Sequence, residues 1–255
     1  EDGVDGFTLG EKMRAGAERF GARTVNAEVT AVDFSQPVKR IVTTDGVYHA
    51  RTVVIAAGAD PRKLGLDGEQ ELTGSGVHYC AHCDGRFYKD KTVAVIGGGN
   101  SAAADALYLS RLAKKVYMVH RRDTLRAERI YREPLYDAEN VELVWDSIVT
   151  ELISDTRLRG IMVKNVKTGD VRELLCDGAF VSIGRVPLTG FLGGSVALDG
   201  SGYIIADEST RTSADGVFAA GDIRTKALRQ VVTAAADGAV AAHYAEEYIS
   251  AMGGL

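Results

Sequence analysis

Uninterrupted apolar segments alternate with glycine-rich turns and with segments of helical periodicity along this chain. The run Thr92–Ile96 is typical of a strand that is buried on both faces of a parallel sheet. A glycine-rich turn follows, then a helical stretch from Ser101 to about Leu112, then a second strand-like run over Lys115–His120. This order predicts an α/β fold. Further strands are predicted over Arg23–Phe34, Lys39–Thr44, Thr52–Ala57, Val141–Trp145, Ile148–Ile153, Ile161–Asn165, Ala179–Ile183 and Val217–Ala220.

Two more helices are predicted near the ends of the chain. The first covers Thr8–Phe20, with Thr8 as its capping residue and Glu11 three residues later. The second is rich in alanine and covers about Ala227–Met252. Its small side chains favour close packing against the rest of the fold.

Glycine and proline interrupt the pattern at Gly58–Pro61 and again at Gly184–Pro187. We therefore expect one domain, residues 62–185, to be inserted within another that consists of residues 1–61 and 186–255. The two interruptions are the candidate hinges between these domains.

The turn after Thr92–Ile96 has the spacing of a dinucleotide-binding fingerprint, Gly97-x-Gly99-x-x-Ala102. Gly97 permits a tight turn, Gly99 lets the backbone approach a pyrophosphate, and the small Ala102 lets helix and strand pack closely. The N–H groups at the start of the helix face the anion. The alternative is a turn of the same shape that binds no nucleotide. The candidate nucleotide-binding residues are Gly97, Gly99, Asn100, Ser101 and Ala102.

The end of the second strand indicates which nucleotide this turn binds. NAD-specific domains commonly place an acidic residue there, whereas this chain has His120, Arg121, Arg122 and, a turn later, Arg126. Guanidinium groups suit bidentate binding of a 2′-phosphate, so the sequence favours NADPH over NADH. The alternative is a solvated basic face that is paired with neighbouring acids.

A pair of cysteines, Cys80 and Cys83, lies shortly before the glycine-rich turn. Such a pair can be a redox couple, half of a zinc site, or two buried apolar residues. Zinc with His78 and His82 would crowd four ligands into six residues, so redox chemistry is favoured and no metal is expected. Asp84 can carry protons as thiol and thiolate interconvert, or it can simply form a turn.

The composition, 45% hydrophobic and 25% charged, is ordinary for one or two globular domains. A net charge of −5 provides no basic field for nucleic acid, and no apolar stretch is long enough to span a bilayer. Three cysteines are too few for a secreted disulfide framework, and an exchangeable pair suits a reducing cytoplasm. The third cysteine, Cys176, is expected to be a buried strand residue.

The motifs together resemble the low-molecular-weight, bacterial-type thioredoxin reductases. The resemblance spans essentially the whole chain, and its motifs follow the order of that family. It implies two Rossmann-like nucleotide-binding domains of the pyridine nucleotide-disulfide reductase type, with an NADPH domain inserted in a FAD domain. The motifs are Cys80–Gly85, Val95–Ala102, His120–Glu128, and Thr212–Asp222 together with Leu228–Ala235.

The resemblance also implies roles for single residues. Cys83 would lie nearer the flavin as the charge-transfer thiolate, Cys80 would attack the partner disulfide, and Asp84 would be the acid–base group. A buried strand that ends in Gly-Asp is also a place where backbone can approach a cofactor. The candidate FAD contacts are Ala57, Gly58, Gly221, Asp222, Arg229, Gln230 and Val231.

The chain departs from the family at its front, because the first strand and G-x-G-x-x-G turn that hold the adenosine diphosphate half of FAD do not occur in residues 1–60. We therefore interpret it as an N-terminally shortened version. Smaller departures are His82 and Ala57, at positions where the family often carries Thr.

The resulting hypothesis is a thioredoxin-disulfide reductase that passes electrons from NADPH through FAD and the cysteine pair to a thioredoxin-like protein. The family analogy implies a cytoplasmic homodimer, with no nucleic acid or membrane partner. The alternatives are the flavoprotein subunit of an alkyl hydroperoxide reductase system and a non-catalytic dinucleotide-binding fragment.

Overall fold

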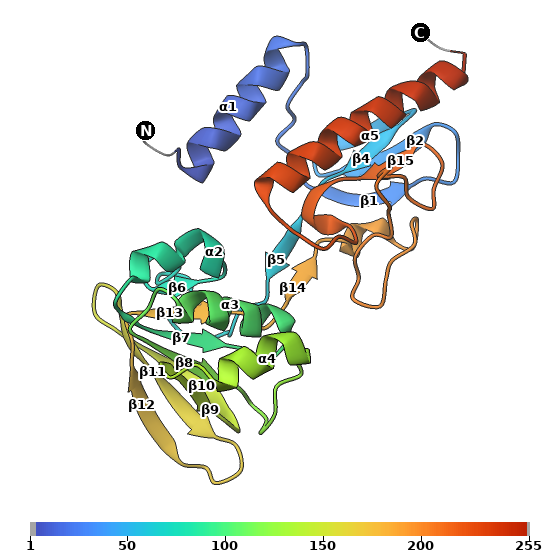
Figure 1. Cartoon of the computed structure of the whole chain (residues 1–255). Coiled ribbons are helices and arrows are strands. Elements are labelled where there is room, and N and C mark those ends of the chain that lie inside the picture. The colour runs from blue at the N-terminus through green and yellow to red at the C-terminus, as the bar shows by residue number, and fades with distance from the viewer. Residues whose placement is uncertain (1–3, 254–255) are drawn as a thin grey trace. The chain divides into compact units, whose positions relative to one another are not determined.

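The computed structural model describes residues 4–253, which form two compact units (Figure 1). The inserted unit consists of Ala59–Val186, and the split unit consists of Glu1–Gly58 together with Pro187–Leu255. Residues 1–3 and 254–255, which the sequence-based domain boundaries include, lie outside the described residues. The assignment of NADPH to the inserted unit and of FAD to the split unit remains a prediction.

The inserted unit contains a five-stranded, all-parallel sheet with the strand order β6-β13-β7-β8-β9. Alternate residues of each strand face opposite sides, so Val93 and Val95 pack with helices whereas Ala94 and Ile96 pack on the other face. The strands are β6 (Val77–His78), β7 (Thr92–Ile96), β8 (Lys115–Val119), β9 (Val141–Val144) and β13 (Gly178–Val181).

Each face of this sheet is covered by a different layer (Figure 1). One face packs against α3 (Asn100–Ser110) and α4 (Arg129–Tyr136) through small and aliphatic side chains such as Ala103 and Leu135. The other face packs against an antiparallel sheet of β10 (Ser147–Ser154), β11 (Leu158–Asn165) and β12 (Val171–Leu175). The predicted strands of this unit are present, whereas β6, β12 and α4 were not predicted.

The two predicted interruptions lie at the boundaries between the units and contain short strands; their role as hinges remains a prediction. Ala59–Pro61 forms β5, Arg185–Pro187 forms β14, and the two strands pair as a short ribbon. The backbone N–H of Arg62 also donates to the carbonyl of Gly184 at 2.9 Å. Extended backbone before proline is the ordinary preference, and this favours pairing over a loop.

The split unit contains two small sheets and two long helices. Strands β1 (Val29–Asp33), β2 (Lys39–Thr43) and β3 (Gly46–Ala50) form an antiparallel sheet, and β4 (Val53–Ile55) pairs in parallel with β15 (Val217–Ala219). The short helices η2 (Gly190–Leu192) and η3 (Gly221–Ile223) belong to the same unit. Its core is formed mainly by Phe34, Ile55, Leu192, Val196, Ile204, Val217, Ala219 and Ile223.

Both predicted terminal helices exist, but their starts differ from the prediction. Helix α1 (Gly6–Arg19) is capped by Asp5, whose Oδ1 accepts the N–H of Thr8, so the predicted Thr8 cap is wrong. Aspartate three residues earlier satisfies the free N–H groups and displaces threonine from that role. Helix α5 (Val231–Ala251) begins four residues later than predicted, because Gln230 and Thr233 form a reciprocal capping box.

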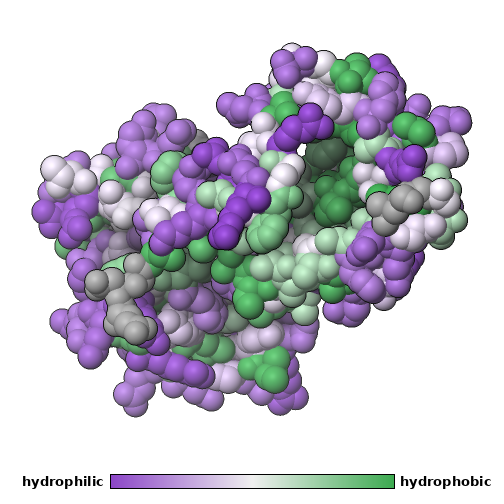
Figure 2. Space-filling model, turned by 90° about the horizontal axis from the view of Figure 1, so that it is seen from above, coloured by the Kyte–Doolittle hydropathy of each residue, from purple (hydrophilic) through white to green (hydrophobic). Residues whose placement is uncertain are grey.

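Hydrophobic side chains reach the surface on the face shown in Figure 2. In the split unit the most exposed large ones include Phe7 and Phe20 near the two ends of α1, a helix with no buried residue. Within residues 4–253, no helix combines the length and apolar character that crossing a bilayer requires.

Candidate active site and nucleotide cavity

Cys80 and Cys83 form a disulfide bond at the start of the short helix α2 (Ala81–Asp84). Cys80 is the N-terminal capping residue of this helix, and its sulfur accepts the N–H of Cys83 at 3.1 Å. The pair is therefore covalently linked, as the redox interpretation requires. The third cysteine, Cys176, is free and buried, and this burial raises the pKa of its thiol to about 12. Its thiol therefore stays protonated and unreactive.

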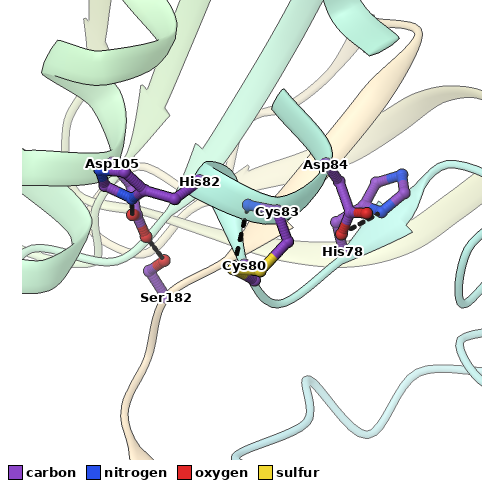
Figure 3. The surroundings of a disulfide bond; sticks show 7 residues. All are labelled: His78, Cys80, His82, Cys83, Asp84, Asp105 and Ser182. Carbon is purple, nitrogen blue, oxygen red and sulfur yellow. Dashed lines mark hydrogen bonds and ion pairs between the residues drawn. A yellow bond between two sulfur atoms is a disulfide. The ribbon is translucent and has the colours of Figure 1, made fainter. Parts of the chain in front are cut away.

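Two histidine–aspartate pairs flank the disulfide in the view of Figure 3. On one side, Nδ1 of the buried His78 lies 3.0 Å from Oδ2 of Asp84. On the other side, Nδ1 of His82 lies 3.9 Å from Oδ1 of Asp105, and the hydroxyl of Ser182 donates to the second carboxylate oxygen of Asp105.

Asp105 is the more buried of the two aspartates, with 16% of its side chain exposed. Burial raises its pKa, and the hydrogen bond from Ser182 partly opposes that rise. Sequence reasoning missed both residues, because Asp105 lies mid-helix in α3 and Ser182 lies 77 positions further on.

The carboxyl ends of the parallel strands enclose a cavity of about 650 Å³ in the inserted unit. Ligands of open α/β sheets bind at this edge, where the strand order reverses. The predicted nucleotide-binding residues Gly97, Gly99, Asn100, Ser101 and Ala102 all line the cavity, and so do His120, Arg121 and Arg126. The sequence did not point to the other lining residues, which include Arg62, Ser147, Val149, Ser182 and Gly184.

Positive charge gathers at one part of this cavity. Arg121 and Arg126 line it, whereas Arg122 is not among the lining residues. His120 is buried, its Nε2 has no hydrogen-bond partner among the described residues, and its pKa is lowered by burial and by Arg126. The cavity is therefore bordered by guanidinium groups, which fits an anionic ligand.

The three glycines of the turn are needed for different reasons. A Cβ atom at Gly97 would overlap the carbonyl of Ser182, and one at Gly98 would overlap the ring of His120. A Cβ at Gly99 would meet no atom within 4 Å, and its φ of −96° is open to any residue. The fold itself therefore does not require glycine at position 99, whereas close approach of a pyrophosphate to this backbone would.

This difference predicts opposite results for two alanine variants. Gly98→Ala should lower the free energy of unfolding by about 1–3 kcal/mol, because the added methyl group overpacks a closed site. Gly99→Ala should leave unfolding unchanged but weaken NADPH binding at least about tenfold, since the methyl group would occupy the pyrophosphate position. Fluorescence of Trp145, the only tryptophan, measures unfolding of the inserted unit, and NADPH titration measures affinity. Equal stability loss in both variants would contradict this assignment.

The candidate FAD residues gather at one edge of the split unit. Strands β4 and β15 are parallel neighbours, so Ala57 and Gly58 follow the first strand where Gly221 and Asp222 follow the second. Gly58 and Gly221 both have φ of +76°, and a Cβ at Gly58 would meet no atom within 4 Å. Because these two residues are glycines, no side chain shields the backbone at this edge, and a cofactor could approach it closely.

The remaining candidate FAD residues, Arg229, Gln230 and Val231, connect this edge to α5. The Arg229 guanidinium donates to the carbonyls of Asp222 and Arg224, both at 3.3 Å. Gln230 caps the helix, and Val231 is its first residue and is exposed. The structure therefore links Arg229 to the Gly221–Asp222 turn by hydrogen bonds.

A buried ion cluster fixes the Gly221 turn. Asp237 on α5 accepts the N–H of Gly221 at 2.8 Å, two guanidinium N–H groups of Arg224 at 2.9 and 2.7 Å, and the ammonium of Lys226 at 2.6 Å. Burial alone would raise the pKa of Asp237, but the hydrogen bonds from Arg224 and Lys226 outweigh it and hold the pKa well below its usual range. Sequence reasoning did not find this cluster.

The fold and these sites define a nicotinamide-dependent flavoprotein disulfide reductase. The family model described as Pyridine nucleotide-disulphide oxidoreductase matches residues 11–238. Within this family the chain belongs to the thioredoxin reductases, on the evidence of the relatives that follow.

A thioredoxin reductase of Treponema pallidum is 45% identical over 249 residues, which cover 98% of this chain and 81% of that protein. One of Streptomyces coelicolor is 45% identical over 254 residues, covering 99% of this chain and 79% of that protein. The crystal structure of thioredoxin reductase from Streptococcus pyogenes matches with a TM-score of 0.89 at 40% identity, covering 97% of this chain and 81% of that one. The resemblance inferred from the motifs is confirmed, and with it FAD and NADPH as cofactors.

Proposed function

We propose that this enzyme passes electrons from NADPH through FAD to the Cys80–Cys83 disulfide and from there to the disulfide of a thioredoxin-like protein. The observation that carries this proposal is the disulfide itself, formed at the start of α2 in the same unit as the nucleotide cavity. A disulfide between cysteines three positions apart in the chain suits a bond that is made and broken in turnover.

In our proposal each residue of the α2 site has a distinct role. FAD, when bound, supplies the electron pair that reduces the disulfide. Cys80 is the interchange thiol that attacks the partner disulfide, and Cys83 is the sulfur nearer the flavin. Asp84 directly follows Cys83, is partly exposed, and exchanges protons with the sulfurs.

The two cofactors would be held in different units. Arg121 and Arg126 would hold the 2′-phosphate of NADPH, and Gly97–Ala102 would hold its pyrophosphate. The edge formed by Gly58 and Gly221 would hold part of FAD, with Arg229–Val231 near its ring system. NADPH, when bound, supplies a hydride.

We also propose a homodimer in a reducing compartment such as the cytoplasm. Exposed apolar side chains of the split unit, among them Phe7 and Phe20, support an association between copies. An exchangeable disulfide favours a reducing compartment. Light scattering of the FAD-loaded protein tests the dimer, and a monomer at micromolar concentration would rule it out.

The activity is tested with FAD-loaded protein, NADPH and an oxidised bacterial thioredoxin. We expect NADPH oxidation in step with the appearance of thioredoxin thiols, one NADPH for each disulfide. An oxidised peroxidase partner with a hydroperoxide serves as the comparison substrate. Faster turnover with that partner would favour the alkyl hydroperoxide reductase alternative.

Nucleotide preference provides a second prediction. Changing Arg121 or Arg126 to Gln should raise the KM for NADPH about tenfold or more and leave the KM for NADH nearly unchanged, because each guanidinium contributes a charge-assisted hydrogen bond to the 2′-phosphate. Arg122→Gln should have a smaller effect, since Arg122 does not line the cavity. Steady-state kinetics with both nucleotides measure the ratio. An equal loss with NADH would assign these arginines to another part of the nucleotide.

A further inference from the structure

A third arginine, Arg62, lines the nucleotide cavity in addition to Arg121 and Arg126. It directly follows strand β5, and its backbone N–H donates to the carbonyl of Gly184 at 2.9 Å. Gly184 also lines the cavity and lies three residues after the end of β13. Arg62 is therefore placed beside the end of β13, whereas the other two arginines follow the end of β8.

The strand order gives the cavity two distinct sides. Strand β7, which leads into the glycine-rich turn, lies between β8 and β13 in the sheet. In a dinucleotide-binding fold the pyrophosphate lies at the helix N-terminus after the first strand, and the adenosine ribose lies at the end of the next strand. That next strand is β8, so the other half of the nucleotide extends over the end of β13. Arg62 therefore borders the nicotinamide half.

A buried carboxylate fixes the segment that carries Arg62. Glu69 accepts the backbone N–H groups of Leu64 at 2.9 Å and of Gly65 at 2.8 Å. It also accepts the hydroxyl of Tyr79 at 2.7 Å. Burial alone would raise the pKa of Glu69, but these hydrogen bonds outweigh it and lower the pKa, so the group is charged at neutral pH. The wall that contains Arg62 is thus held in place without a bound ligand.

The side chain of Arg62 is available to bind a ligand. It is exposed, and its guanidinium makes no hydrogen bond or ion pair with another residue of the described range 4–253. Binding of a phosphate therefore breaks no existing contact of this group. A guanidinium presents a planar fork of donors that matches two phosphate oxygens.

We propose that Arg62 binds the phosphate on the nicotinamide side of the NADPH pyrophosphate. This inference rests on the proposed placement of NADPH in the cavity. NADPH and NADH carry the same pyrophosphate, so Arg62 contributes to the affinity for both nucleotides. Its role differs from that of Arg121 and Arg126, which distinguish the two nucleotides through the 2′-phosphate.

The test measures the binding of three nucleotides to the FAD-loaded protein by titration calorimetry. NADP⁺ contains both halves, ADP-ribose 2′-phosphate lacks only the nicotinamide, and 2′,5′-ADP lacks the second phosphate and everything beyond it. Arg62→Gln should weaken binding of the first two about tenfold or more, because it removes a charge-assisted hydrogen bond. Binding of 2′,5′-ADP should be nearly unchanged.

Two matched variants serve as controls. Lys63→Gln removes the same charge at the next position, which is exposed and does not line the cavity, so it should bind all three nucleotides like the wild type. Arg126→Gln should weaken all three, because each of them carries the 2′-phosphate.

Each other outcome for Arg62→Gln has a definite meaning. Equal weakening of 2′,5′-ADP would assign Arg62 to the adenosine half or to a purely structural role. Unchanged binding of ADP-ribose 2′-phosphate with weakened NADP⁺ would assign it to the nicotinamide ring. Either result would overturn the proposal, as would unchanged affinity for NADP⁺.

The same titrations separate this proposal from the proposed function. If Arg126→Gln weakens all three nucleotides but Arg62→Gln binds NADP⁺ like the wild type, only the Arg62 inference fails. If the wild type binds none of them, the proposed placement of NADPH fails as well. Steady-state kinetics provide an independent readout, in which Arg62→Gln should raise the KM for NADPH and for NADH by the same factor. A changed ratio between the two nucleotides would contradict the assignment to the shared pyrophosphate.

Discussion

Replacing either Cys80 or Cys83 with Ser abolishes reduction of a thioredoxin disulfide while NADPH oxidation with an artificial electron acceptor continues. In the proposed reaction, electrons reach the flavin from NADPH bound in the cavity, whose lining includes neither cysteine, and leave toward a protein through the disulfide. We expect at least about a thousandfold loss of protein-disulfide reduction, the scale on which removal of a nucleophile acts. Parallel assays with oxidised thioredoxin and with ferricyanide measure the two activities.

The third cysteine provides the matched control. Cys176→Ala should retain both activities, because this thiol is buried and unpaired in the inserted unit. Thiol counts in denaturant add a direct check, since the oxidised wild type should expose one thiol, from Cys176, and Cys80→Ser two, from Cys83 and Cys176. Equal loss of both activities in the cysteine variants would contradict this division of roles.

The site residues that were predicted from sequence lie close to one another along the chain. Gly97, Gly99 and Ala102 follow a buried strand and begin a helix, so their spacing alone predicted the turn that lines the cavity. Cys80 and Cys83 are likewise neighbours in sequence. In such cases the chemistry depends on a few consecutive residues, and tertiary structure adds little to the prediction.

The remainder depends on strand order, which periodicity does not encode. Ser182 and Gly184 reach the cavity because β13 lies beside β7 in the sheet, although most of the inserted unit separates them in sequence. Helix α4 was missed because Pro134 lies inside it, and proline normally argues against a helix interior. The Thr8 cap was wrong because the helix begins earlier, at Gly6, where Asp5 caps it by accepting the N–H of Thr8.

Asp237→Asn should strongly destabilise the split unit and release FAD. The change removes the carboxylate charge that pairs with both Arg224 and Lys226, whose side chains are 4% and 8% exposed. Leaving buried cations without their counterion costs about 3–5 kcal/mol. The same change loosens the N–H of Gly221, so FAD affinity should fall together with stability. Circular dichroism in urea follows the helices, of which α5 alone has 21 residues, and flavin fluorescence follows release.

At acid pH, Asp237→Asn and the wild type should become equally stable. The folded-state pKa of Asp237 lies below its unfolded value, so its contribution is fully present above about pH 4 and is lost as pH falls through the folded pKa. Trp145 lies in the inserted unit and provides an internal reference for unfolding there. Glu246→Gln, an equal loss of charge at an exposed position of α5, should change stability by less than about 0.5 kcal/mol. If Asp237→Asn were as stable as Glu246→Gln at neutral pH, this result would contradict the stabilising role that we assign to the Asp237 cluster at the Gly221 turn.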